Sequence, residues 1–370
     1  MADRSRGNRP ARSHHLTGPY REDSLPPSRR EPRQQRVRRP GCILAAGLLL
    51  AVISAAVVTL LLLLIFLRPR MPEARNAIWL GIDWGQNIQP DEAAENLANL
   101  LRAEGIGTAY VWLTWLQEDL TWSDTTFENM PAFVAQMRRF YPELRLDAWI
   151  GLPTELPDYR LDNEDVRSAV NAMVQRALND FGFDGIHLNA EPVWSGDEDF
   201  LTVLRGVRQS IGPDAWLSVS VPPDWNTGAP GIPVGPYTTP EAYWSAEYKQ
   251  RVAFLVNEIT VMAYTSGLSS PQDYETWMAF QIERFVSALA PVSDLGTRLI
   301  IGIPTYDAEP PGHDPAVENV LTAITGIRRG IAESGEDGKL VYGVALYAEW
   351  TTDANEWEAY RQLWLLQAAN

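Results

Sequence analysis

The segment 183–192, which reads FDGIHLNAEP, holds the side chains best suited to chemistry. In an extended strand the side chains alternate between two faces, so His187, Asn189 and Glu191 share one face and the other is apolar. If the apolar face packs on helices, three polar groups point into the interior, which is costly unless a function uses them. Glu191, at the end of this segment, would then have a functional role. In the structural alternative, Glu191 pairs with an arginine and His187 is a satisfied core histidine.

The elements around this segment repeat. Amphipathic stretches such as 91–104 and 164–180 separate short apolar runs, and a last helix is expected around 354–368. The expected strands are eight in number and cover residues 77–84, 107–115, 144–152, 183–191, 215–222, 258–265, 298–306 and 341–349. Apolar strands that alternate with helices predict a parallel sheet, and eight such units predict an α/β fold with a single closed (β/α)8 TIM barrel over residues 77–370. Glu191 would end the fourth strand, at the face where barrels place their active sites.

Short motifs in this barrel resemble those of glycoside hydrolase family 18, the chitinase-like TIM barrels. The fourth strand of that family reads Asp-Gly-x-Asp-x-Asp-x-Glu, and the strand-six, strand-seven and strand-eight motifs follow in the same order here. The matching residues are Asp184, Gly185 and Glu191, then 261–264 (VMAY), 302–306 (GIPTY) and 343–347 (GVALY). The resemblance implies a substrate-assisted retaining mechanism, in which the glutamate protonates the leaving oxygen and the sugar's own acetamido oxygen attacks.

This fourth-strand motif is degenerate. His187 and Asn189 stand where the family has aspartates, and Thr265 replaces an aspartate of strand six. Asn189 can orient an acetamide but carries no negative charge, a division of labour similar to the Asn-x-Glu pair of family 85 endo-N-acetylglucosaminidases. The resemblance implies Glu191 as the acid, with Asn189 and Tyr264 positioning the acetamide. Because no carboxylate neighbours Glu191, and a protonated His187 would oppose its proton, we expect activity at mildly acidic pH.

Aromatic and acidic residues gather at the expected strand ends. Indole rings stack on sugar faces, so tryptophans there favour a glycan-binding cleft, although each one taken singly could be a packing residue. The expected substrate-binding set is His187, Trp84, Asp83, Trp194, Tyr306, Tyr347 and Trp350, and Trp115 and Trp225 also fall near strand ends. A two-carboxylate retaining mechanism would need Asp307 or Glu349 about 5 Å from Glu191.

Other classes of site are poorly supported. Residues 71–370 hold two histidines, His187 and His313, and the single cysteine is Cys42, so no metal site and no cofactor is expected. The same residues carry 18 basic and 43 acidic side chains, a net charge of −25 that argues against nucleic-acid binding. Nothing in the sequence sets the oligomeric state.

The first part of the chain has a different character. Residues 1–41 are rich in arginine, proline and serine and are expected to form a disordered cytoplasmic tail. Residues 42–67 are free of charge, roughly 39 Å as a helix, and predict a transmembrane anchor rather than a cleaved signal peptide, followed by a linker at 68–76. The arginine bias predicts a single-pass protein of the cell membrane with the barrel outside the cytoplasm.

These expectations converge on a membrane-anchored glycoside hydrolase that cleaves glycans containing N-acetylhexosamine. The alternative from another class is a catalytically inactive, chitinase-like carbohydrate-binding barrel. Retention of Glu191 favours the enzyme, whereas His187, Asn189 and Thr265 favour the binding protein.

Overall fold

The computed structural model describes residues 49, 51–55, 57–59, 75–156, 158–225 and 243–366. The chain divides into two units, Met1–Pro69 and Arg70–Asn370. The predicted tail at 1–41 and residues 68–74 of the predicted linker lie outside the described residues. Most of the predicted anchor at 42–67 does too, and its described positions are helical. Among the residues that are described, no helix is both long and apolar enough to span a membrane.

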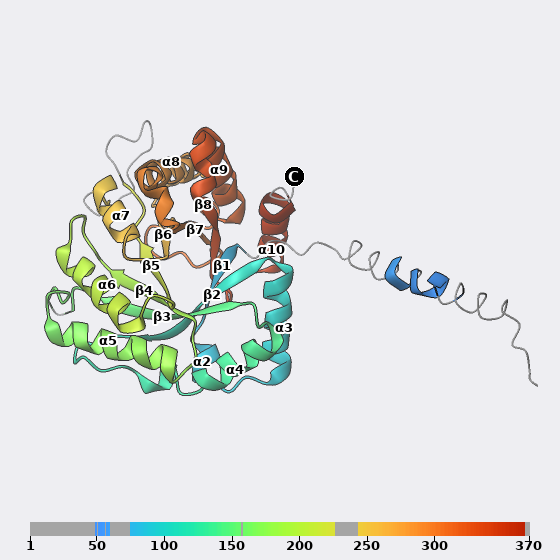
Figure 1. Cartoon of the computed structure of the whole chain (residues 1–370). Coiled ribbons are helices and arrows are strands. Elements are labelled where there is room, and N and C mark those ends of the chain that lie inside the picture. The colour runs from blue at the N-terminus through green and yellow to red at the C-terminus, as the bar shows by residue number, and fades with distance from the viewer. Residues whose placement is uncertain are drawn as a thin grey trace, which may run out of the picture. The chain divides into compact units, whose positions relative to one another are not determined.

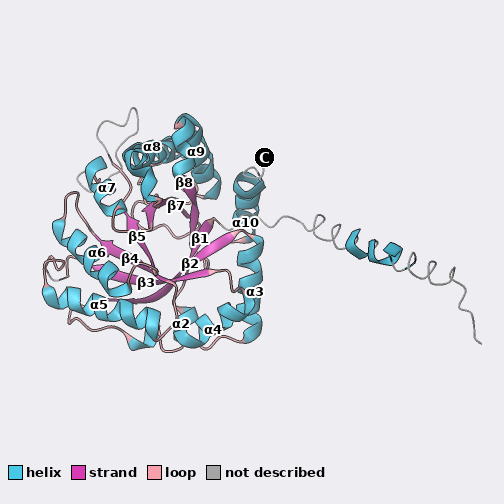
Figure 2. Cartoon of the chain, viewed as in Figure 1, coloured by secondary structure: helices cyan, strands magenta, loops and turns pink. Residues whose placement is uncertain are grey.

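Eight parallel strands close into a barrel in sequence order, with β1 paired to both β2 and β8. Figure 2 shows these strands as an inner ring with the helices around it. The strands are β1 (Asn76–Leu80), β2 (Ile106–Trp115), β3 (Arg145–Pro153), β4 (Gly185–Glu191), β5 (Trp216–Val221), β6 (Glu258–Met262), β7 (Arg298–Pro304) and β8 (Val341–Tyr347). The predicted (β/α)8 barrel is confirmed.

Helices connect the strands and form the outer layer (Figure 1). They are α2 (Asp83–Gln86), α3 (Asp91–Ala103), α4 (Met130–Phe140), α5 (Glu164–Asn179), α6 (Glu198–Ile211), α7 (Ala246–Ala253), α8 (Pro271–Leu289), α9 (Val320–Glu333) and α10 (Ala354–Tyr360). Short 3-10 turns occupy Asp124–Thr126, Ala290–Leu295 and Gly335–Leu340, and a π-helical turn, Arg361–Leu365, extends α10. Polar side chains start several helices: Asn163 accepts the backbone N–H groups of Asp165 and Val166, and Asp353 forms a capping box with Glu356.

The predicted boundaries hold within about two residues for most elements, and one departure affects the site. The first strand was expected to run to residue 84 but ends at Leu80, because the chain turns at Gly81 and α2 begins at Asp83. Asp83 and Trp84 therefore lie on a helical turn above the barrel rather than on a strand. Trp225, expected near the rim, packs against Trp277 with ring centroids 5.1 Å apart and is buried in the core.

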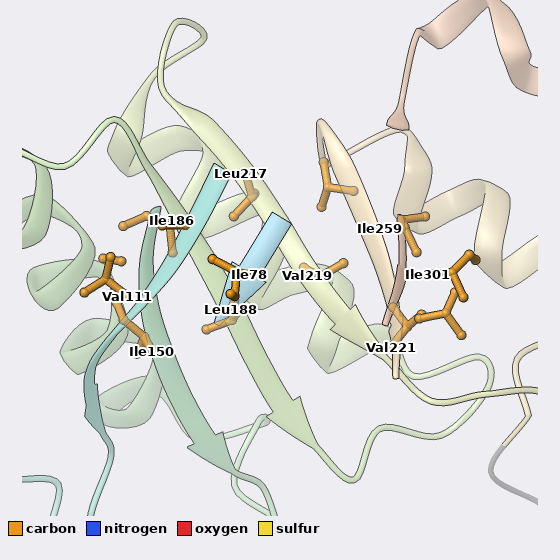
Figure 3. Close-up of a cluster of buried hydrophobic side chains, with 14 of the residues drawn as sticks. Ile78, Val111, Ile150, Ile186, Leu188, Leu217, Val219, Val221, Ile259 and Ile301 are labelled. Atoms are coloured by element: carbon orange, nitrogen blue, oxygen red, sulfur yellow. The ribbon is translucent and has the colours of Figure 1, made fainter. Parts of the chain in front are cut away.

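The apolar core lies mainly between the barrel and its helices. Side chains on the outer face of the strands, including Ile186 and Leu188 of β4, are buried there with alternate residues of the other strands (Figure 3). A second, smaller cluster fills the barrel interior around Trp79, Tyr110 and Trp149. The strand periodicity thus sends the apolar face of β4 to the helices and its polar face inward, as the sequence predicted.

Charged side chains close the amino-terminal end of the barrel. Arg145 lies 3.1 Å from Asp147 and 2.9 Å from Glu258, and both carboxylates are fully buried. The hydroxyl of Tyr110 donates to Glu258 at 2.7 Å, and the Arg145 guanidinium lies over the ring of Trp216. In this group, the basal charge cluster (Tyr110, Arg145, Asp147 and Glu258), one guanidinium faces two carboxylates at the opposite end of the strands from Glu191.

Candidate active site

Glu191 ends β4 at the carboxyl-terminal mouth of the barrel, and its position is fixed by the neighbouring loop. Its carbonyl accepts the backbone N–H of Thr154 at 3.0 Å, and the Thr154 hydroxyl donates to the carbonyl of Pro192 at 2.6 Å. The Thr154 side chain and backbone therefore hold the chain on both sides of the Glu191 carboxyl group, which remains reachable from solvent.

Asn189 lies beside this carboxyl group. Its Nδ2 atom donates a long hydrogen bond of 3.4 Å to Glu191 Oε2, whereas its buried Oδ1 has no partner among the described residues. Desolvation by the surrounding protein raises the pKa of Glu191, and the Asn189 hydrogen bond opposes this shift. A glutamic acid with a raised pKa beside an amide with a free acceptor can donate a proton and hold an N–H group of a ligand.

These two residues line a cavity of about 470 Å³ that we name the glutamate pocket. Such a volume is sufficient for a small-molecule ligand. The cavity also brings together three tyrosines that the sequence predicted, from the ends of β6, β7 and β8. Its lining comprises Trp79, Trp149, Asn189, Glu191, Ser220, Pro222, Pro223, Met262, Tyr264, Thr265, Tyr306, Pro310 and Tyr347.

The tyrosines form one aromatic wall. Tyr264 stacks on Tyr347 with centroids 5.2 Å apart, and Tyr306 meets both rings edge-on. Burial raises the pKa of Tyr264 well above its usual value and that of Tyr306 to about 12. All three phenols therefore stay protonated near neutral pH and are available as hydrogen-bond donors.

A buried carboxylate supports this wall from behind. Glu318 accepts the backbone N–H groups of Thr265 and Ser266, each at 2.7 Å. His313 contacts Glu318 through Nδ1 at 3.0 Å and the carbonyl of Tyr306 through Nε2 at 3.0 Å. Thr265 has a φ of 60°, an unfavourable value for a β-branched residue, and these contacts hold it there. Glu318 and His313 thus position the loops after β6 and β7.

His187 does not reach the pocket, which departs from the predicted contact with substrate. It is completely buried beneath it, its ring stacked on Tyr110 at 3.8 Å, and its two nitrogens bond Ser218 and Ser220 at 2.8 Å each. Burial, with a smaller contribution from Arg145, lowers the pKa of His187 well below its usual value. A neutral His187 does not oppose the proton on Glu191, and its position is that of the satisfied core histidine considered as the alternative.

A second cavity, of about 560 Å³, adjoins the first, and we name it the tryptophan pocket. Trp149 and Tyr347 line both cavities and separate them. The predicted residues Asp83, Trp84 and Trp350 lie here rather than beside Glu191. The lining comprises Gly81, Ile82, Asp83, Trp84, Gln89, Trp112, Trp115, Thr126, Trp149, Tyr347, Glu349 and Trp350.

A third cavity, of about 400 Å³, lies next to both the glutamate pocket and the tryptophan pocket. Asn189 and Glu191 line it together with Trp112 and Trp115, so it shares residues with both other cavities. Three adjoining cavities with common walls form a groove across the barrel mouth, and Glu191 borders two of them. This arrangement suits an extended ligand with Glu191 at an internal position.

The acids proposed for a two-carboxylate mechanism lie elsewhere. Glu349 lines the tryptophan pocket and accepts the indole N–H of Trp84 at 3.2 Å, and Asp307 is exposed and lines none of the three cavities. Burial and Asn189 are the causes of the pKa shift of Glu191, with no contribution from a second carboxylate. Trp194 is partly buried after β4 and lines none of the three cavities. Neither Asp307 nor Glu349 therefore shares a cavity with Glu191.

Sequence reasoning missed the aromatic floor. Trp79 and Trp149 are almost completely buried and both line the glutamate pocket. The signal was present, because the alternation applied to the fourth strand also points Trp79 and Trp149 inward within the predicted strands 77–84 and 144–152. Glu318 and His313 follow strand seven on a loop, where no periodicity indicates direction. Among the described residues there is no group of three or more acidic, histidine or cysteine side chains that could hold a metal ion.

Comparisons with known proteins agree with this architecture. No protein-family model matches the sequence, and no curated protein matches it significantly. Solved structures do match: the C-terminal domain of a putative chitinase from Desulfitobacterium hafniense has 13% identity and a TM-score of 0.53, covering 81% of this chain and 100% of that one. The spore cortex-lytic enzyme of Bacillus cereus has 11% identity and a TM-score of 0.51, with 79% and 75% covered.

A class V chitinase from Pseudomonas fluorescens has 15% identity and a TM-score of 0.50, with 78% and 98% covered. At such low identity these similarities define the fold alone, which is a (β/α)8 barrel like those of the chitinases and the cortex-lytic enzyme. The predicted resemblance is therefore confirmed at the level of the fold.

Proposed function

We propose that the protein is a glycoside hydrolase that cleaves glycans containing N-acetylhexosamine by a substrate-assisted retaining mechanism. The observation that carries the proposal is the pairing of Glu191, whose pKa is raised by burial, with Asn189, whose Oδ1 is unpaired, in the glutamate pocket. The similarity of the fold to chitinases and to a cortex-lytic enzyme supports the substrate class.

Each residue has a defined task in this reaction. Glu191 gives its proton to the glycosidic oxygen as the bond to the anomeric carbon breaks. The acetamido oxygen of the same sugar attacks that carbon, and Asn189 Oδ1 accepts the acetamido N–H and so orients it. The Tyr264 hydroxyl donates to the acetamido oxygen, and Trp79 and Trp149 supply the apolar floor for the sugar ring. Water then opens the cyclic intermediate, with Glu191 taking up a proton from it, which retains the configuration.

The test compares the full-length protein with Glu191→Gln on oligosaccharides with and without N-acetyl groups. We expect cleavage confined to N-acetylated substrates and its loss in the variant, with products followed by mass spectrometry. Cleavage of glycans without N-acetyl groups would contradict the substrate-assisted reaction and favour a two-carboxylate one.

A carbohydrate-binding barrel without turnover is the second candidate. The observation in its favour is that Asn189 brings no negative charge to stabilise the cation that forms during the reaction. Binding of N-acetylated oligosaccharides with equal affinity by the wild type and by Glu191→Gln, without any product, would establish this alternative.

We further propose that residues 42–67 anchor the protein in the cell membrane with the barrel outside the cytoplasm. Their uncharged, apolar sequence and the arginine-rich residues before them support this orientation. Protease added to intact cells should degrade the barrel while leaving an N-terminal tag protected. Recovery of the protein in the soluble fraction would refute the anchor.

A further inference from the structure

The tryptophan pocket combines aromatic walls with two carboxylates. Trp112 meets Trp149 edge-on at 4.5 Å, and Trp350 meets Tyr347 edge-on at 5.8 Å. A side chain at Gly81 would come within 2.9 Å of the Trp350 ring, so the glycine allows that indole to lie against the loop after β1. Asp83 and Glu349 complete the lining.

The carboxylates of this pocket are not balanced by a cation. Among the described residues that line it there is no lysine, arginine or histidine. Burial raises the pKa of Glu349; the hydrogen bond from Trp84 opposes the shift and the nearby Asp83 adds to it. Two acids on the wall of one aromatic cavity attract a positive charge, and indole faces stabilise ammonium groups by cation–π contact.

Two residues that line this cavity, and that it shares with the neighbouring cavities, carry an unpaired indole N–H group. Trp149, which separates the two cavities, is 7% exposed, and its indole N–H has no acceptor among the described residues. The indole N–H of Trp112, on the same wall, is also unpaired. Residues 71–370 carry a net charge of −25, which attracts cationic chains to this part of the protein.

We propose that the tryptophan pocket binds a hexosamine unit with a free, protonated 2-amino group, so that the protein selects partly de-N-acetylated glycans. The ammonium group would lie between Asp83 and Glu349, with the sugar ring against the indoles. This inference rests on the proposed function, because it takes the cavity as a continuation of the groove that holds the scissile bond. It names the substrate class more narrowly: an N-acetylated unit in the glutamate pocket and an amino sugar in the adjoining one.

The experiment compares two β-1,4-linked tetrasaccharides, of glucosamine and of glucose, which differ only in an ammonium or a hydroxyl group at carbon 2. Neither has an acetamido group, so neither is a substrate for the proposed reaction. Titration of the full-length protein, followed by tryptophan fluorescence, should show about tenfold tighter binding of the glucosamine chain. Equal affinities would overturn the inference.

Two charge variants locate the effect. Asp83→Asn with Glu349→Gln keeps the hydrogen-bond acceptors, including the one for Trp84, and should reduce the preference to within about twofold. Glu336→Gln with Asp337→Asn removes the same charge from an exposed turn at the other end of the barrel and should retain the preference. A preference that survives in the first variant, or that both variants lose equally, would overturn the proposed site in favour of general attraction to an acidic surface.

Hydrolysis of N-acetylated oligosaccharides is measured on the same samples. If the protein prefers the amine in a pocket-dependent way but does not hydrolyse N-acetylated oligosaccharides, the proposed reaction is wrong and the amine site is retained. Hydrolysis without the amine preference would sink the site alone. Thermal unfolding of each variant confirms that the comparison concerns folded protein.

Discussion

Ionisable side chains lie at both ends of the barrel, but those at the amino-terminal end are buried and paired, whereas Glu191 at the mouth is exposed and has few partners. In the basal charge cluster, Arg145 contacts two buried carboxylates and Glu258 also accepts from Tyr110. At the mouth, Glu191 has one long hydrogen bond from Asn189, whose own Oδ1 is unpaired. Burial raises the pKa of Asp147 at one end and of Glu191 at the other, but only Asp147 has an arginine to oppose the shift.

This difference separates a structural role from a functional one. Buried charges stabilise a fold only when they are paired with one another. If one partner is removed, the remaining charge stays buried without compensation, and the fold is destabilised. A carboxyl group left with few partners contributes little to the fold and keeps its capacity to bind and react. One chemical change, glutamate to glutamine, should therefore have opposite consequences at the two ends.

The largest effect is expected for Glu191→Gln. Removal of the proton donor should lower the rate of hydrolysis by about 10²- to 10⁴-fold, the usual contribution of a general acid. The free energy of unfolding should change little, because the Glu191 side chain is exposed and has only one long hydrogen bond. Initial rates and urea unfolding measure the two quantities, and a variant that loses stability together with activity would break the comparison.

Glu258→Gln makes the same change in the basal charge cluster. We expect a loss of roughly 3 kcal/mol in the free energy of unfolding, because Arg145 keeps only Asp147 as a charged partner. The folded fraction should retain its turnover rate. A rate that falls more than stability does would mean that the basal cluster takes part in the reaction.

Tyr264→Phe tests whether one hydroxyl group at the barrel mouth contributes to the reaction. The variant keeps the stacking on Tyr347 and removes only the hydroxyl group. The loss of a hydrogen bond to a developing charge should lower kcat by about 10- to 100-fold with KM little changed. Tyr306→Phe is the matched control on the same wall, and an equal loss in both would contradict a specific role for Tyr264.

The pH dependence follows from the direction of the Glu191 shift. The acid must be protonated, so activity is present below the raised pKa of Glu191 and falls about tenfold per pH unit above it. His187 cannot produce this limb, since burial lowers its pKa well below the usual value. A rate profile with its optimum above neutrality would count against Glu191 as the acid.

The smallest overall effect is expected for His187→Asn. Loss of the ring that bonds Ser218 and Ser220 should cost about 1–3 kcal/mol of stability, because buried hydroxyls lose partners. Substrate affinity, measured by titration, should be unchanged in the folded protein. A large rise in KM would restore the direct contact that the sequence predicted for this residue.

The sequence by itself determined the barrel and the direction of its fourth strand. Alternation along a strand is a local property, so Asn189 and Glu191 on one face and Ile186 and Leu188 on the other could be assigned without knowing any neighbour. The same reasoning, applied to the other strands, would have found Trp79 and Trp149.

Only the tertiary structure decided which residues meet. Barrel closure pairs β1 with β8 and so brings the loops after these two strands into one cavity. Trp84 and its hydrogen-bond partner Glu349 meet there although they are 265 residues apart in the sequence, and Asp83 lines the same cavity. The position of His187 along its strand keeps it away from the pocket. It faces inward like Glu191 but lies beneath the pocket, where it bonds Ser218 and Ser220. Period-two alternation fixes the face of a side chain, whereas its height and its neighbours depend on strand register and loop packing, which are long-range properties.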